Sequence, residues 1–498
     1  MGLLRFLVYP EELMSRWPEV HRAYISGFDG RIYPTRVELE NNVVTCRRPH
    51  SDSGKLHVPW PVPDHGRPVL STTSLRERDE PYLLALELAR GKLSTLRDQC
   101  AVWEMLHMDV PAESRRIEQE AFRLFSRAAA SGVAPPEASA IATQSIAKAT
   151  EAAELLVDAY VQQRLAMRRH THLHPTVLTG CTLDAAVPDS PEETMFLRSF
   201  NSAVVPAEWR LIESTEGECR WDALDRMVGW CTDNRLIVRG GPLIDLGARG
   251  MPEWLAPWQS DVVNMQSFIC DFIETAVSRY TGRVRLWETS AHANTGVALG
   301  LSEENRLALA ARAIEAARRT DSDSQLFIRV DQPWSEYQAR GQHRLSAFQF
   351  VDALVRANIG LHGVNLEIAI GYRPRGSLLR DRLSLSRLID AWSQLGIQLH
   401  VTLAMPSSEA GDPDAHPDLE VDEGVGDEQW TEARQAREVG EYVRLLTAKP
   451  AVTGIYWCHF HDSLPHRFPH GGLVDVDGRV KAVARAFAPE DDEATAAT

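Results

Sequence analysis

The sequence predicts an α/β fold, in which a (β/α)8 TIM barrel follows a small β-sandwich-like domain and a helical bridge. Between residues 170 and 487, short apolar runs alternate with segments of helical spacing, which is the order of a β/α barrel. Residues 1–80 carry short runs of alternating apolar and polar positions, and residues 81–169 have helical spacing. Periodicity alone leaves a doubly wound open sheet as an alternative for the third region.

Composition excludes several classes of protein. A chain of 498 residues with a net charge of −16 is too long for one small domain and lacks the basic face that nucleic-acid binding needs. The seven cysteines are scattered, without a CxxC pair, which favours a reducing compartment. No apolar run approaches the ~20 residues of a membrane span. We expect a soluble, cytoplasmic protein with no nucleic-acid or membrane partner.

The first 80 residues read as short strands joined by turns. Turn pairs occur at positions 29–30, 41–42 and 53–54, and the proline-rich stretch 58–68 is an irregular or edge segment. Trp60, Tyr24 and Tyr33 are either a stacking platform for a sugar or ordinary core and interface packing. Residues 81–169 follow as a helical hairpin or three-helix bridge, with prolines 111, 135 and 136 at helix starts.

The third region contains eight candidate strands, at 176–183, 202–205, 236–240, 284–287, 325–330, 363–370, 398–403 and 454–457. Helical patterns lie between most of them, at 221–232, 262–279, 302–319, 347–357, 384–395 and 430–447. We expect the barrel to span 170–487, and 488–498 to be a disordered acidic tail. An acidic stretch at 408–428 reads as a flexible surface loop.

Catalytic groups of such barrels lie at the carboxyl ends of the strands. Glu288 and Glu367 lie on predicted strands four and six, and His292 follows strand four. The three side chains are candidates for acid, base and nucleophile, because an imidazole titrates near neutral pH. The alternative is that each glutamate is a structural partner of an arginine on a neighbouring strand, for which the chain offers Arg239, Arg285 and Arg329.

Histidines cluster after the last strand, in WCHFHDSLPHRFPH. His459, His461 and Asp462 place imidazoles and a carboxylate in one loop, but their spacing fits no familiar zinc motif. We expect no metal and no cofactor. A second group, His170, His172 and His174, reads as a linker running into the first barrel strand.

Several motifs, in register, resemble the family-10 glycoside hydrolases, the xylanase family. SFNSAVVPAEWR from Ser199 is similar to the family's FN…TPENxMKW, and NRLIVRGGPLI resembles the stretch ending in VRGHTLVWH. MPEWL at Met251 resembles LPSW, and VTGIYWCHFHDS from Val452 resembles ITGVTFWGxxD. The resemblance covers nearly the whole third region and implies hydrolysis of O-glycosidic bonds in a β-linked glycan or glycoside.

Both usual catalytic glutamates are replaced in this alignment. On the family's WDVVNE segment, His292 falls on the acid, and on ITELD, Leu403 falls on the nucleophile while Thr402 matches. Gly241 stands for the histidine of VRGH, and Glu367 falls in the family's QxH motif. No Asp or Glu lies between Asp390 and Glu409 to substitute.

Three function classes follow from these residues. The first is a glycoside hydrolase with relocated catalytic groups, Glu367 with Glu288 or His292. The second is a non-catalytic carbohydrate-binding protein, and the third is a scaffold. The substrate-binding positions that the resemblance implies, together with other polar groups of the expected cleft, are Glu208, Trp209, Arg210, Trp287, Asp331, Trp457, His459, His461 and Asp462. A carbohydrate is the expected partner, with Trp334 as a further stacking candidate.

Overall fold

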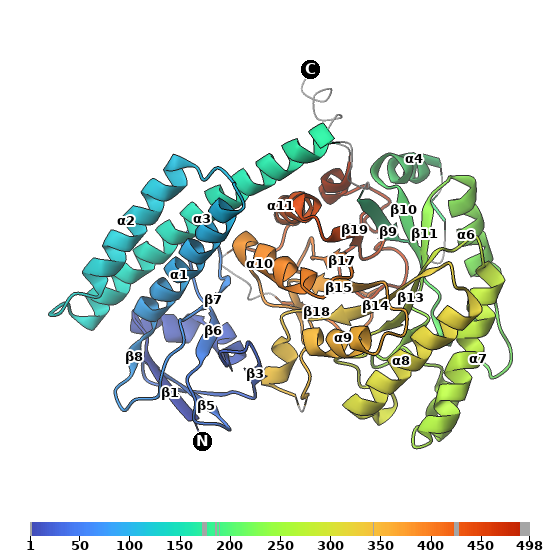
Figure 1. The fold of residues 1–498 in the computed structure, drawn as a ribbon, viewed down its shortest axis with the longest axis horizontal. Coiled ribbons are helices and arrows are strands. Elements are labelled where there is room, and N and C mark those ends of the chain that lie inside the picture. The colour runs from blue at the N-terminus through green and yellow to red at the C-terminus, as the bar shows by residue number, and fades with distance from the viewer. Residues whose placement is uncertain are drawn as a thin grey trace.

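A computed structural model describes residues 2–171, 177–184, 187–188, 190–341, 343–422 and 428–488 (Figure 1). The predicted linker histidines 172 and 174 and nearly all of the predicted tail lie outside these ranges. No helix in the described ranges is long and apolar enough to cross a membrane.

The N-terminal region forms two four-stranded sheets, ordered β4-β5-β1-β8 and β3-β2-β6-β7. Their strands are β1 Gly2–Leu7, β2 Tyr24–Ser26, β3 Ile32–Tyr33, β4 Arg36–Glu40, β5 Val43–Arg48, β6 Lys55–Pro59, β7 Val69–Ser71 and β8 Tyr82–Leu83. Apolar side chains of both sheets share one core with the first helix. Trp60 and Tyr24 are buried, and Trp60 packs edge-on against Trp17 with ring centroids 5.3 Å apart. Both rings therefore serve packing.

Three helices follow: α1 Leu84–Met105, α2 Ala112–Ala128 and α3 Pro135–Thr171. The small buried side chains of α3 let the helices pack closely, and they include Ala138, Ala142, Ala149, Ala152 and Ala153. Helix α3 runs from the N-terminal region to the barrel and lies against α10 and α11 (Figure 1).

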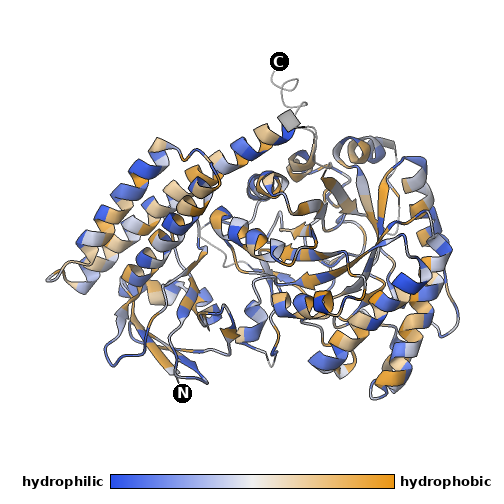
Figure 2. Cartoon of the chain, in the orientation of Figure 1, coloured by the Kyte–Doolittle hydropathy of each residue, from blue (hydrophilic) through white to orange (hydrophobic). Residues whose placement is uncertain are grey.

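The third region is a closed barrel of eight parallel strands, as predicted. The strands are β9 Leu178–Thr182, β10 Ser202–Val205, β11 Ile237–Gly240, β13 Leu286–Ala291, β14 Gln325–Asp331, β15 Gly363–Ala369, β17 Gln398–Ala404 and β19 Val452–Trp457. Pairing of β19 with β9 and of β11 with β13 closes the ring, and β12 Ile244–Asp245 adds to β13. The open-sheet alternative is excluded. Apolar residues concentrate on these strands and on the helix faces toward them (Figure 2).

Helices surround the barrel: α4 Ser190–Ser199, α5 Trp209–Ile212, α6 Asp222–Asp233, α7 Val262–Tyr280, α8 Glu303–Thr320, α9 Ala347–Arg356, α10 Arg382–Ser393 and α11 Glu432–Ala448. Helices α7 to α11 each start at a side-chain cap, at Asp261, Ser302, Ser346, Asp381 and Thr431. Such caps satisfy orphan N–H groups and define where each helix begins.

Part of the acidic stretch predicted as a flexible loop is anchored to the barrel. Within it, β18 Glu420–Val421 pairs with β16 Tyr372–Arg373. Asp412 Oδ2 lies 3.0 Å from His466 Nε2 and accepts the His470 N–H at 2.8 Å. The loop after β17 is therefore tied to the loop after β19; residues 423–427 lie outside the described ranges.

Candidate active site at the mouth of the barrel

Alternate residues of the barrel strands point into its interior. Asn365 Nδ2 donates to Glu288 Oε2 at 2.8 Å, and Thr402 Oγ1 donates to Asn365 Oδ1 at 3.0 Å. Glu367 lies two residues beyond Asn365 on β15 and shares its face. Leu403 follows Thr402 on β17, so its side chain lies on the opposite face of the strand, toward the helices.

Glu288 is fully buried and is paired with arginines. Arg329 Nη2 lies 2.6 Å from Glu288 Oε1, and Arg239 Nη2 lies 3.9 Å from Oε2. The Arg239 guanidinium also stacks over Tyr456, 3.8 Å from the ring centroid. Burial disfavours the charge of Arg329, but Glu288 and Glu367 outweigh burial and raise its pKa. Glu288 therefore forms the structural ion pair with arginine that the sequence offered as the alternative to a catalytic role.

Glu367 is closed off by Arg467, a residue of the loop after β19. The Glu367 side chain is 1% exposed and that of Arg467 is 28% exposed. Arg467 Nη1 donates to both carboxylate oxygens, at 2.9 and 3.0 Å, and Arg329 Nη1 lies 3.5 Å from Oε2. Burial alone raises the pKa of Glu367, but Arg467, His292 and Arg329 reverse that effect and hold the pKa well below its usual range. Glu367 is an anion at neutral pH.

His292 links this ion pair to Asp245. Its Nδ1 lies 2.6 Å from Asp245 Oδ1, and its Nε2 lies 3.5 Å from Glu367 Oε1 and 2.6 Å from Arg467 Nη1. Burial lowers the pKa of His292, but the charges of Asp245 and Glu367 prevail and raise it to about 9. Because an imidazolium and a guanidinium both donate, protonation of His292 weakens its contact with Arg467.

These groups form what we call the mouth network, comprising Asp245, Glu288, His292, Arg329, Asn365, Glu367 and Arg467. A retaining glycosidase needs a proton donor and an attacking carboxylate about 5 to 5.5 Å apart. Here protonated His292 and anionic Glu367 supply the two types of group, but their nearest atoms are 3.5 Å apart and Arg467 contacts both. In this arrangement the charges compensate each other and no space for a sugar separates them.

Most of the predicted substrate-binding side chains are buried: Trp209, Trp287, Asp331, Trp457, His459, His461 and Asp462. Two of the indoles have internal partners, since Trp457 Nε1 donates to Gly471 O at 2.6 Å and Trp209 Nε1 donates to Glu213 Oε2 at 2.7 Å. The side chains of Glu208 and Arg210 are partly exposed and form an ion pair of 2.8 Å. A role of any of these side chains in substrate binding stays a prediction.

The histidine-rich loop forms a separate polar cluster. Ligand atoms of His459, Asp462 and His466 lie within 4.8 Å of one another. Asp462 is already engaged, because Lys481 Nζ contacts its Oδ2 and the Gly472 N–H donates to its Oδ1 at 2.6 Å. An ammonium group thus lies against the carboxylate that a metal ion would need. The predicted lack of a metal stays a prediction.

Sequence reasoning missed Asp245, Asn365 and Arg467. A signal existed for two of them, because Asp245 follows strand β11 and Arg467 follows β19, and both segments end at the same face of the barrel. Arg467 was not predicted because the histidines around it were considered as metal ligands instead. Arg285, expected as a possible partner of a glutamate, immediately precedes β13 and so lies at the opposite end of the barrel.

Comparison with known proteins identifies the barrel. The sequence profile of Glycosyl hydrolase family 10 matches residues 171–464. Endo-1,4-beta-xylanase B of Neocallimastix patriciarum is 22% identical over 218 residues, which cover 41% of this chain and 24% of that protein. Endo-1,4-beta-xylanase 3 of Hypocrea jecorina is 26% identical over 149 residues, which cover 26% of this chain and 41% of that protein. The chain therefore spans less than half the length of either relative.

Among solved structures, native xylanase 10B from Thermotoga maritima aligns with a TM-score of 0.47 and 18% identity, over 62% of this chain and 93% of that chain. The family profile itself covers more than half of the 498 residues and spans the strands of the barrel. The chain belongs to glycosyl hydrolase family 10.

Proposed function

We propose that this chain is a non-hydrolytic member of its family, which keeps the barrel to bind a carbohydrate without cleaving it. The observation that carries this proposal is the pairing of both interior carboxylates with arginines, Glu288 with Arg329 and Glu367 with Arg467. A carboxylate that must attack a sugar has to be accessible, and one that must donate a proton needs a raised pKa. Glu367 meets neither condition.

Departures from the family motifs support the same conclusion. In the motif alignment His292 takes the place of the acid and Leu403 takes the place of the nucleophile, so neither position carries a carboxylate. Gly241, which stands for the family's histidine, has φ +122°, and a Cβ there would lie 2.4 Å from Glu288 O. The backbone at this position therefore excludes a side chain.

A carbohydrate is proposed as the ligand from membership of the family and from the resemblance at Glu208 and Arg210, which stay partly exposed. The relatives named above are xylanases, so β-linked xylose and glucose oligosaccharides are the first ligands to test. We also propose a cytoplasmic location and domain boundaries at 80/81 and 169/170.

One observation favours a second candidate function, hydrolysis with relocated groups. Arg467 lies on a loop, and its side chain is more exposed than that of Glu367, with which it forms an ion pair. If Arg467 withdrew, protonated His292 could give its proton to the leaving oxygen while Glu367 attacked the sugar or took a proton from water. Asp245 would hold the imidazole through Nδ1.

The test is hydrolysis of aryl β-glycosides and of xylo- and gluco-oligosaccharides by wild type, Glu367→Gln and Arg467→Ala, with and without chelator, combined with calorimetric titration of the same oligosaccharides. We expect no turnover above the blank in any variant and saturable binding to wild type. Turnover that disappears in Glu367→Gln and rises in Arg467→Ala would establish the second candidate instead. Neither turnover nor binding would leave only the scaffold function.

A further inference from the structure

A cavity of about 250 Å³ opens among the loops at the carboxyl end of the barrel. Its walls come from the loops after β13, β14 and β15, and from Arg22 of the N-terminal region. The cavity is therefore completed by two parts of the molecule that are far apart in the sequence.

Three arginines line this cavity: Arg22, Arg340 and Arg375. Arg22 has partners, since it pairs with Asp422 and its Nη2 donates to Gly376 O at 3.4 Å. Arg340 and Arg375 make no side-chain hydrogen bond or ion pair with any residue that the structure describes. Guanidinium groups gathered around one cavity repel each other unless an anion lies between them.

The nearby carboxylates, Glu336 and Asp422, offset these charges only in part. Glu336 also lines the cavity, but Arg380 pairs with it and the Leu378 N–H donates to it at 3.2 Å. Asp422 is used by Arg22. Partial desolvation, followed by the like charge of Arg22, lowers the pKa of Arg340. The cavity is locally positive although the whole chain carries a net charge of −16.

A neutral polar side chain is also available in the cavity wall. Gln332 is 8% exposed and lines the cavity, yet its amide has no hydrogen-bond partner among the described residues. The Gln332 backbone has φ +45°, and Ser335 in the same loop has φ +66°, conformations that are uncommon for non-glycine residues. A ligand inside the cavity can therefore bond to the Gln332 amide.

We propose that this cavity binds a small hydroxylated molecule through a phosphate or carboxylate group. Arg340 and Arg375 hold the anionic group, as guanidinium forks match the oxygens of either anion, and Gln332 bonds to a hydroxyl. A volume of about 250 Å³ lies just below the range of ordinary ligand pockets and suits one sugar-sized ring more than a polymer. The site stands whether or not the barrel hydrolyses glycosides, because it uses no residue of the mouth network.

The test is calorimetric titration of the full chain with glucose 6-phosphate, glucuronate, inorganic phosphate and glucose. We expect the two anionic sugars to bind, glucose not to bind, and affinity to fall as salt is raised. Arg340→Gln and Arg375→Gln should each weaken binding at least ~10-fold, the effect of losing a hydrogen bond to a charged group. Arg344→Gln is the matched control, since this exposed arginine of the same loop pairs with Glu304 outside the cavity.

The two anionic sugars distinguish the source of the charge, because the tighter of them tells whether the natural group is a phosphate or a carboxylate. Equal affinity for inorganic phosphate and glucose 6-phosphate would overturn the part of the proposal that involves Gln332. Equal loss in Arg344→Gln and Arg340→Gln, or binding of glucose as tight as that of its phosphate, would overturn the site itself. Circular dichroism of each variant shows that a loss of binding is not a loss of folding.

Discussion

At the scale of single residues, charge compensation explains the mouth of this barrel. A buried carboxylate is tolerated only when cations and hydrogen bonds repay its desolvation. Glu288 and Glu367 share Arg329, and each has a further arginine, Arg239 or Arg467. The two carboxylates that catalysis would need are therefore neutralised by arginines, which stabilises them as buried anions.

His292 makes stability depend on pH. Its pKa is raised to about 9 in the fold, so protonation stabilises the folded state fully below the unfolded pKa of about 6.5, and this contribution is lost as pH rises through 9. We expect wild type to lose up to about 3 kcal/mol between pH 7 and pH 10 relative to His292→Gln, at 1.36 kcal/mol per pKa unit. Thermal unfolding at several pH values measures this, and parallel pH curves for the two proteins would contradict it.

At the scale of elements, glycines on the barrel strands make room for large side chains on neighbouring strands, on both faces of the sheet. A Cβ on Gly240 of β11 would lie 2.5 Å from the Trp287 ring, and a Cβ on Gly180 of β9 would lie 2.9 Å from the Tyr456 ring. Small and large residues on neighbouring strands thus complement each other, as in any closely packed core. This packing holds β13 and β19, whose ends carry the site.

Gly240→Ala tests this complementarity. We expect a loss of about 1 to 3 kcal/mol, because an added methyl group forces either Trp287 or the strand to move. Gly229→Ala in helix α6 is the control, since a Cβ there meets nothing within 4 Å and the change should stabilise the helix by about 1 kcal/mol. Thermal denaturation compares the two variants, and opposite signs of the change in Tm are the expected result.

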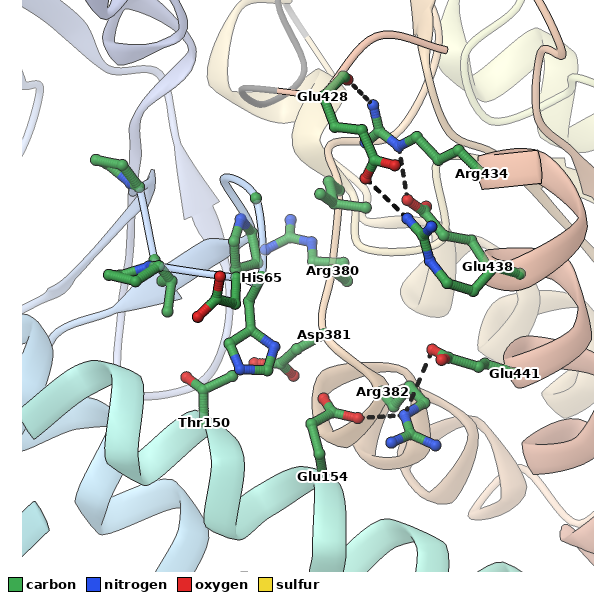
Figure 3. Close-up of a pocket in the computed structure, with 18 of the residues that line it drawn as sticks. His65, Thr150, Glu154, Arg380, Asp381, Arg382, Glu428, Arg434, Glu438 and Glu441 are labelled. Carbon is green, nitrogen blue, oxygen red and sulfur yellow. Dashed lines mark hydrogen bonds and ion pairs between the residues drawn. The ribbon is translucent and has the colours of Figure 1, made fainter. Parts of the chain in front are cut away.

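At the scale of the whole molecule, buried and half-buried ion pairs fasten the N-terminal parts to the barrel. Lys92 of α1 lies 2.6 Å from Asp381, the cap of α10, and Arg382 of α10 lies 2.5 Å from Asp158 of α3. Figure 3 shows Arg382 between Glu154 and Glu441, at the edge of a cavity of about 890 Å³ where the N-terminal region, α3 and the barrel meet. These contacts join segments that the sequence presents as separate units.

Lys92→Met should uncouple them. The substitution keeps the apolar stem but leaves the buried Asp381 without its cation, which costs about 3 kcal/mol. In scanning calorimetry we expect one transition for wild type and two for the variant, the earlier belonging to the N-terminal parts. Lys148→Met removes an exposed pair with Glu151 on α3 and should change little. A single unshifted transition in Lys92→Met would show that the pair does not couple the two parts.

The sequence by itself determined the order of elements and the family. Alternation and helical spacing are local properties, so all eight barrel strands were predictable within a few residues of their ends. The bridge was predictable as helical, but the sequence left open whether it was a hairpin or three helices. The positions of Glu288, His292 and Glu367 at one end of the barrel followed from strand order, because parallel strands all end at the same face.

Tertiary structure alone decided what those residues can do. The sequence left open whether each glutamate was catalytic or paired with an arginine. Arg467 reaches the site from a loop 100 residues beyond Glu367, and Asp245 reaches it from the short strand β12, 47 residues before His292. Protonation and accessibility depend on the distance and burial of such partners, which no spacing along the chain encodes. The flexible loop expected at 408–428 differed for the same reason, since its anchors are Tyr372 and His466.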